Sequence, residues 1–176
     1  MVTKEDLAQA ILNLTASQEK ISQEMKASQE KTNKEVEKLA SYIGNIGRNQ
    51  GDVAEEFFIN SISPTLKVGG IQYDELNKNM YKKTKKAEGE FDIVLINGKD
   101  LAIIETKYKA HENDLDNLIH KKHKNFKNLY PQYDNYTHHL GLASFYINDD
   151  IKEKALQNNV MILQRKGEVV ETILPL

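Results

Sequence analysis

The chain has 176 residues, a formal net charge of −2 and no cysteine. The missing cysteines exclude disulfides and thiolate metal sites, and the small net charge means that any nucleic-acid-binding surface must be local. No apolar run approaches the length of a membrane span, and the N-terminus lacks a signal-peptide pattern. We therefore expect a cytoplasmic protein that makes no membrane contact.

Residues 1–46 are predicted to form a helical coiled-coil arm, which fits the modest hydrophobic content of 39%. The pentapeptide Ala-Ser-Gln-Glu-Lys at residues 16–20 recurs at 27–31, and the apolar positions follow the same eleven-residue period. That period predicts helices that lie nearly straight or supercoil weakly to the right. Because one such helix cannot bury its apolar stripe alone, we expect a homo-oligomer formed through this arm. The alternative is a solvated helix or a partly disordered segment.

Residues 47–176 are predicted to form a second domain of mixed α/β architecture. Gly44 and Gly47 predict a flexible joint or a helix end before it, and Pro64 ends the first helix of the domain. The order of elements indicates a mixed sheet flanked by helices. The predicted elements are a helix at 52–62, strands at 71–76 and 80–86, strands at 91–96 and 101–107, a helix at 111–129, a strand at 140–147, a helix at 149–156, and strands at 160–164 and 169–174.

The two apolar strands on either side of the turn Asn97–Asp100 end in charged residues. If the turn uses all four residues, Ile96 pairs with Leu101 and Asp92 lies opposite Glu105. Side chains alternate along a strand, so Glu105 and Lys107 project from the same face. Two carboxylates and an ammonium then converge at the end of an apolar hairpin, which favours a divalent metal site over a solvated ion pair.

At these residues the chain resembles the PD-(D/E)XK phosphodiesterase superfamily, whose signature is an Asp on one hairpin strand and Glu-x-Lys on the next. Phe91 stands where the signature has proline. The spacing Gly47-x-x-x-Gly51-x-x-x-Glu55 is similar to a helix of a bacterial branch that carries an N-terminal coiled coil. The resemblance implies a restriction-endonuclease-like core and a helix acid at Glu55, with Glu56 as the alternative.

The same resemblance implies metal-dependent hydrolysis of DNA that leaves 5′-phosphate and 3′-hydroxyl ends. Mg²⁺, or Mn²⁺ in its place, would be held by Asp92, Glu105 and the backbone carbonyl of Thr106, with Glu55 holding a second metal or a water. Lys107 would orient the attacking water and neutralise charge on the phosphate. An ordinary lysine is a weak base at neutral pH, so electrostatic positioning is the favoured role for Lys107.

Contacts to nucleic acid require local positive charge, and two lysine clusters offer it. One lies before the hairpin and includes Lys85 and Lys86; the other lies on the helix at 111–129 and includes Lys121, Lys122, Lys124 and Lys127. The alternative for both clusters is solubility alone. His138 and His139 are adjacent on a predicted strand and face opposite ways, so we expect them to be structural.

The alternative to a nuclease is a catalytically silent module that uses the nuclease fold to bind DNA or a protein partner. Retention of Asp92, Glu105, Lys107 and a helix glutamate favours catalysis. The sequence leaves open whether the substrate is DNA or RNA.

Overall fold

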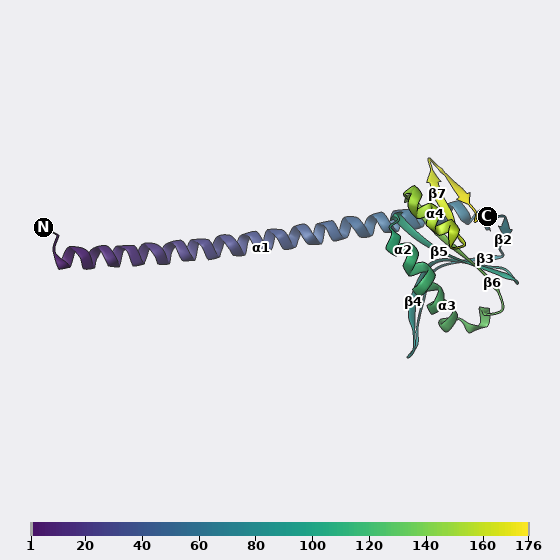
Figure 1. The fold of residues 1–176 in the computed structure, drawn as a ribbon, viewed down its shortest axis with the longest axis horizontal. Helices are drawn as coiled ribbons and strands as arrows, with labels where there is room; N and C mark the ends of the chain where they lie inside the picture. The colour runs from purple at the N-terminus through teal and green to yellow at the C-terminus, as the bar shows by residue number, and fades with distance from the viewer. Residues whose placement is uncertain (1, 176) are drawn as a thin grey trace. The chain divides into compact units, whose positions relative to one another are not determined.

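A computed structural model describes residues 2–175 and has a long N-terminal helix and a mixed six-stranded sheet (Figure 1). This is the α/β fold class that the sequence predicts. Contacts divide the chain into two compact units, residues 1–47 and residues 48–176. None of the helices within residues 2–175 combines the length and apolar composition needed to span a bilayer.

Helix α1 (Lys4–Ile62) begins at a reciprocal cap and continues much further than predicted. The hydroxyl of Thr3 accepts the Asp6 N–H at 3.1 Å, and the Asp6 carboxylate accepts the Thr3 N–H at 2.9 Å. The helix passes through Gly44 and Gly47 without a break, so the predicted helix end there is wrong. A glycine costs a helix interior only about 1 kcal/mol, which neighbouring turns outweigh. The helix ends two residues before Pro64, as expected.

The six-stranded sheet has its strands in chain order, β3-β4-β5-β6-β7-β8. The β5–β6 and β6–β7 pairs are parallel, and the other pairs are antiparallel. A separate two-stranded sheet joins β1 to β2. The strands are β1 (Lys67–Val68), β2 (Ile71–Gln72), β3 (Glu75–Lys83), β4 (Glu88–Ile96), β5 (Asp100–Lys109), β6 (Thr137–Tyr146), β7 (Val160–Lys166) and β8 (Val169–Ile173).

In place of the two strands predicted at 71–76 and 80–86, the structure has the two-residue strand β2 at Ile71–Gln72 and one long strand, β3, at Glu75–Lys83. This strand lies at the sheet edge, where its polar residues give no clear alternation to mark its ends. Its C-terminal end is Lys83, so Lys85 and Lys86 lie in the turn to β4 rather than in a strand.

Each parallel pair of strands needs a helical crossover, and both crossovers pack on one face of the sheet. The first contains α2 (Glu112–Asn117), a π-helical segment η1 (Leu118–Lys122) and α3 (His123–Leu129), followed by the short 3₁₀ turn η2 (Pro131–Tyr133); the second contains α4 (Asp149–Gln157). The sequence predicted one uninterrupted helix at 111–129, and the π-helical segment was not foreseen.

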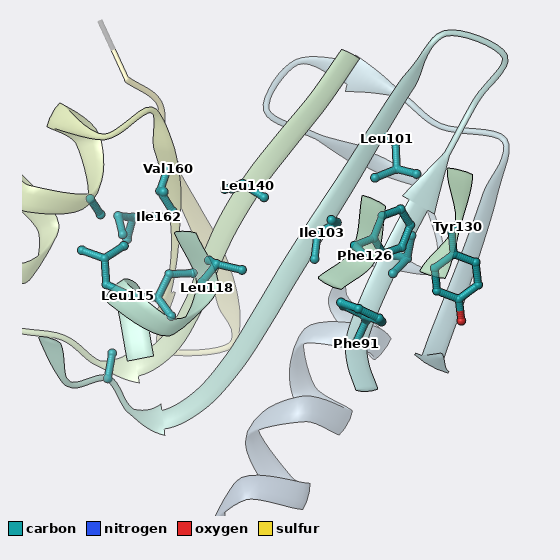
Figure 2. Close-up of a cluster of buried hydrophobic side chains, with 14 of the residues drawn as sticks. Phe91, Leu101, Ile103, Leu115, Leu118, Phe126, Tyr130, Leu140, Val160 and Ile162 are labelled. Atoms are coloured by element: carbon teal, nitrogen blue, oxygen red, sulfur yellow. The ribbon is translucent and has the colours of Figure 1, made fainter. Parts of the chain in front are cut away.

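Two apolar cores lie on opposite faces of the sheet. The face under α2, α3 and α4 buries side chains that include Phe91, Ile103, Leu118, Phe126 and Leu140 (Figure 2). The other face packs on the C-terminal part of α1 through Ala54, Phe58 and Ile62. Because strands covered on both faces are apolar throughout, a charged side chain inside this sheet needs a specific partner.

The hairpin β4–β5 has the predicted register. Ile96 pairs with Leu101, and the ladder continues to the pair Ile93–Ile104. The side-chain oxygen of Asn97 accepts the amide hydrogens of Lys99 at 2.8 Å and of Asp100 at 2.6 Å, which fixes the turn.

Candidate active site

Asp92 occupies an irregular position in the middle of the sheet. The β3–β4 ladder passes from Lys78–Ile93 to Met80–Phe91, so Asp92 lies opposite Asn79. Asn79 has a φ of 51°, a left-handed conformation that is uncommon inside a strand. On its other side, the β4–β5 ladder ends one residue short of Asp92. Continuing that register places Asp92 opposite Glu105, as the sequence predicts.

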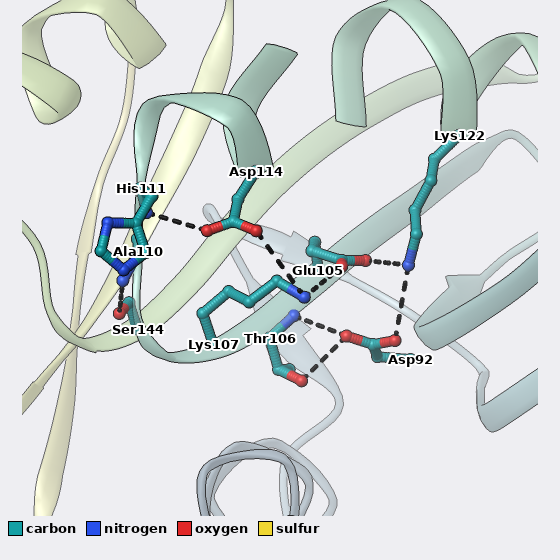
Figure 3. Close-up of polar contacts among 9 residues, drawn as sticks. All are labelled: Asp92, Glu105, Thr106, Lys107, Ala110, His111, Asp114, Lys122 and Ser144. Atoms are coloured by element: carbon teal, nitrogen blue, oxygen red, sulfur yellow. Dashed lines mark hydrogen bonds and ion pairs between the residues drawn. The ribbon is translucent and has the colours of Figure 1, made fainter. Parts of the chain in front are cut away.

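The carboxylate of Asp92 is held by donors from two other elements (Figure 3). Its Oδ2 accepts the backbone N–H of Thr106 at 2.7 Å and the Thr106 hydroxyl at 2.9 Å. Its Oδ1 lies 3.7 Å from Nζ of Lys122. The orientation of this carboxylate is therefore fixed by the neighbouring strand β5 and by η1, in the first crossover.

The carboxylate of Glu105 is buried, with 5% of its side chain exposed, and both of its oxygens face lysines. Oε1 lies 2.9 Å from Nζ of Lys107, which projects from the same face of β5, as the alternation predicts. Oε2 accepts a hydrogen bond from Nζ of Lys122. A buried carboxylate is tolerated only where such partners are present.

Lys107 is held in its charged form by the acids around it. Burial alone would lower the pKa of Lys107, but Glu105, Asp114 and Asp92 together outweigh this and raise the pKa above its usual value. Asp114 approaches Lys107 to 3.9 Å, and its other oxygen accepts the His111 N–H at 2.8 Å. The sequence reasoning missed Asp114; the signal that marks it is the capping-box spacing from His111 to Asp114 at the start of α2.

Glu55 stands apart from this cluster. It lies on α1 and lines a surface hollow with Asp52, Glu56 and Asn79, among others. Burial raises the pKa of Glu55, the charge of Asp92 raises it further, and a hydrogen bond with Asn79 opposes the rise. Within residues 2–175, no three His, Asp or Glu side chains come close enough to form a metal-binding group. The structure thus brings Asp92 and Glu105 together without Glu55.

The pair of carboxylates nevertheless fits a small divalent cation. Asp92 Oδ1 and Glu105 Oε2 both face the ammonium of Lys122, which stands in for a cation between them. Mg²⁺ prefers oxygen ligands and commonly takes only one or two carboxylates, with water completing its shell. Thr106 contacts Asp92 through its amide and its hydroxyl, whereas the predicted metal ligand from this residue is its backbone carbonyl.

The lysines predicted to contact nucleic acid separate into two groups. Lys122 points inward to the carboxylates. The others are exposed: Lys121, Lys124 and Lys127 on the crossover helix, and Lys85 and Lys86 in the β3–β4 turn. A sequence signal for the inward lysine exists, because Lys122 lies four residues from Leu118 and four from Phe126, both of which are fully buried.

The adjacent histidines face opposite ways, as predicted. His138 contacts His123 (Nδ1 to Nε2, 3.1 Å) and the carbonyl of Tyr133 at 2.9 Å. His139 contacts Asp100 at 2.9 Å. Neither histidine reaches the carboxylate cluster in these contacts.

Comparisons with known proteins give no family and a weak structural similarity. No family model and no curated protein matches the chain. Among solved structures, the chain is similar to Can2 from Sulfobacillus thermosulfidooxidans in complex with cyclic tetra-adenylate, with 15% sequence identity and a TM-score of 0.48. The match covers 64% of this chain and 31% of Can2, so the chain spans about a third of that protein's length. Similarity at this level assigns neither a family nor an activity.

Proposed function

We propose that this chain is a divalent-cation-dependent deoxyribonuclease of the PD-(D/E)XK type, from the bacterial branch with an N-terminal coiled coil. One observation carries the proposal: Asp92 and Glu105, on adjacent strands, both contact the ammonium of Lys122, while Lys107 pairs with the other oxygen of Glu105. An ordinary surface ion pair does not explain this cluster, because Glu105 is buried, with only 4% of the residue exposed.

Each residue then has a separate role in phosphodiester hydrolysis. Asp92 and Glu105 hold Mg²⁺ or Mn²⁺, which supplies Lewis-acid polarisation of the phosphate when bound. Lys107 is cationic, so it orients the attacking water and stabilises negative charge on the phosphate. Thr106 fixes the carboxylate of Asp92 through its amide and hydroxyl. Glu55, on α1, lies outside this pair and is proposed to hold a second metal or a water.

The exposed lysines supply the contacts to DNA. Phosphate contacts position a protein on a duplex without reading its sequence, and lysine side chains commonly make them. Lys121, Lys124 and Lys127 lie on the same crossover helix as Lys122, which reaches the carboxylates. Lys85 and Lys86 extend from the turn that precedes the strand bearing Asp92. This arrangement supports binding of a phosphate backbone near the cluster.

The N-terminal part of α1 is proposed to bind a second copy of this chain. Its large apolar side chains are exposed, and no partner within this unit covers them. Steps of three or four residues separate these side chains, except for a seven-residue step from Leu14 to Ile21 and an eleven-residue step from Met25 to Val36, a pattern typical of a coiled-coil seam. The seam includes Leu7, Ile11, Leu14, Ile21, Met25, Val36, Leu39, Ile43 and Ile46.

The test is cleavage of supercoiled plasmid with Mg²⁺ or Mn²⁺, by wild type and by Asp92→Asn, Glu105→Gln and Lys107→Met. Matched controls are Asp134→Asn and Lys67→Met, at exposed positions away from the cluster. We expect cleavage by wild type and both controls, and its loss in the three site variants and in EDTA. Cleavage that survives all three substitutions refutes the assignment. Absence of cleavage by wild type with either metal favours the silent DNA- or protein-binding module.

A further inference from the structure

Lys122 occupies the one place where the two acidic side chains of the site meet. Its ammonium lies 3.7 Å from Asp92 Oδ1 and donates to Glu105 Oε2. It comes from the last residue of the π-helical segment η1. Its side chain is 22% exposed, so it lies between the buried carboxylates and the solvent (Figure 3).

Counting the four carboxylate oxygens shows what Lys122 does. Asp92 Oδ2 is bound by Thr106, and Glu105 Oε1 is bound by Lys107. The remaining two oxygens, Asp92 Oδ1 and Glu105 Oε2, both face Lys122. These are the two oxygens that a cation shared by both acids would use. A cation bridging them therefore has to replace the Lys122 ammonium.

Without an ammonium, the two carboxylates would repel each other in a poorly solvated place. Lys122 thus stabilises the metal-free site, and the same contacts make it a competitor for any metal. Lys107 differs, because it also pairs with Asp114 and leaves the shared oxygens free.

A hollow beside Lys122 can accept its displaced side chain. Lys122 also lines a surface hollow of about 270 Å³ together with Glu90, Asn117, Lys121 and Asn125, among others. A lysine side chain has a flexible four-carbon stem, so its ammonium can move without a change in the helix. In that hollow it lies beside the exposed Lys121, where phosphate contact is proposed.

We propose that Lys122 is an exchangeable counterion: it holds Asp92 and Glu105 together in the metal-free protein and is displaced when a divalent cation binds. The exchange rests on the proposed function, which supplies the class of ligand, a small divalent cation. It deepens that function by naming a residue whose charge sets the affinity for the metal. Lys122 is a positioning residue by this account, and its effect is on metal binding before any chemistry.

The test is calorimetric titration of the full-length chain with Mg²⁺ and with Mn²⁺. Lys122→Met keeps the length of the side chain and removes the charge, and Lys122→Gln is a second neutral variant that keeps a hydrogen-bond donor. The matched control is Lys124→Met, an exposed lysine two residues further along the same crossover helix. Asp92→Asn reports whether binding occurs at the proposed carboxylates.

We expect both neutral variants to bind the metal about tenfold more tightly than wild type, because a competing charge has been removed. Lys124→Met should match wild type, and Asp92→Asn should bind weakly or not at all. Thermal melts add a second readout. Without metal, Lys122→Met should have a lower melting temperature than wild type, and added metal should raise its melting temperature by more than it raises that of wild type. Metal binding by Lys122→Met alone, with none by wild type, also supports the exchange.

Equal or weaker metal binding by both neutral variants overturns the exchange, as does absence of binding in every variant. If Lys122→Met fails to fold without metal, Lys122→Gln decides by the same criterion. Because neither readout uses cleavage, the two proposals fail separately. Tighter metal binding by the neutral variants, together with absence of plasmid cleavage by wild type, would keep the counterion role and favour the silent module over the nuclease.

Discussion

The carboxylate of Asp92 accepts both the backbone N–H and the hydroxyl of Thr106, at 2.7 and 2.9 Å. These contacts form where the β4–β5 ladder has already ended, at the pair Ile93–Ile104. A side chain therefore takes the place of the backbone partner at this point of the hairpin. The two strands separate next to the acidic pair, and the side chain that joins them is itself a proposed metal ligand.

Replacing Thr106 with valine should both destabilise the protein and weaken metal binding. Valine has nearly the same shape and removes only the hydroxyl that donates to Asp92. Loss of a hydrogen bond to a charged, partly buried group costs about 1–3 kcal/mol. Urea unfolding measures the first effect and Mg²⁺ titration the second, with Thr172→Val, at an exposed position of β8, as control. Unchanged metal affinity in Thr106→Val would mean that Thr106 does not position Asp92.

Asn79 offers a test that separates backbone strain from side-chain chemistry. Its φ of 51° costs an alanine about 1 kcal/mol and costs a glycine almost nothing. Its side chain shares a hydrogen bond with Glu55. We expect Asn79→Ala to unfold at lower urea than Asn79→Gly, while both lose plasmid cleavage to the same extent. Full cleavage by Asn79→Gly would show that the side chain is dispensable.

The hairpin could be predicted because its determinants are local. The turn residues Asn97–Asp100 and the alternation of apolar side chains fix the register, and the register places Asp92 opposite Glu105. The crossover helix could be predicted from its apolar spacing and from Pro131, which follows its end.

Other features depend on contacts that a sequence pattern does not contain. The passage of α1 through Gly47 reflects the balance between a small glycine cost and the stability of the flanking turns. The π-helical segment η1, which ends at Lys122, has the sequence Leu-Ile-His-Lys-Lys, and this sequence has no signature of its own. Lys122 is a different case: it was assigned with the exposed lysines around it, although its four-residue spacing from Leu118 and from Phe126 marks the inward face of the helix.

The contact between His123 and His138 should make the protein less stable at mildly acidic pH. The His138 Nε2–H must donate to the Tyr133 carbonyl, so a neutral His138 accepts the His123 Nε2–H at its Nδ1. Burial lowers the pKa of His123, and the charges of His138 and Lys127 lower it further. His123 therefore binds a proton more tightly in the unfolded chain than in the folded protein. Stability is fully present above the usual histidine pKa of about 6.5 and is lost as the pH falls through the lowered folded value.

Urea unfolding between pH 8 and 5 measures this dependence. His123→Gln keeps an N–H donor toward His138 and cannot take up the proton, so its free energy of unfolding should vary less with pH than that of wild type. His120→Gln, at an exposed position on the same crossover helix, is the control and should follow wild type. An equal pH dependence in wild type and His123→Gln would rule out His123 as the titrating group.

The exposed seam of the N-terminal helix predicts that the chain associates with itself. Sedimentation of the full-length protein should give at least a dimer, because an isolated helix of this composition gains stability only when its apolar stripe is covered. Met25→Lys places a charge in the seam and should shift the species toward the monomer. Gln23→Lys adds the same charge two residues away, about 200° around the helix, and should leave the association unchanged. A monomeric wild type, or equal effects of the two substitutions, would refute pairing through this seam and leave the apolar stripe to another partner.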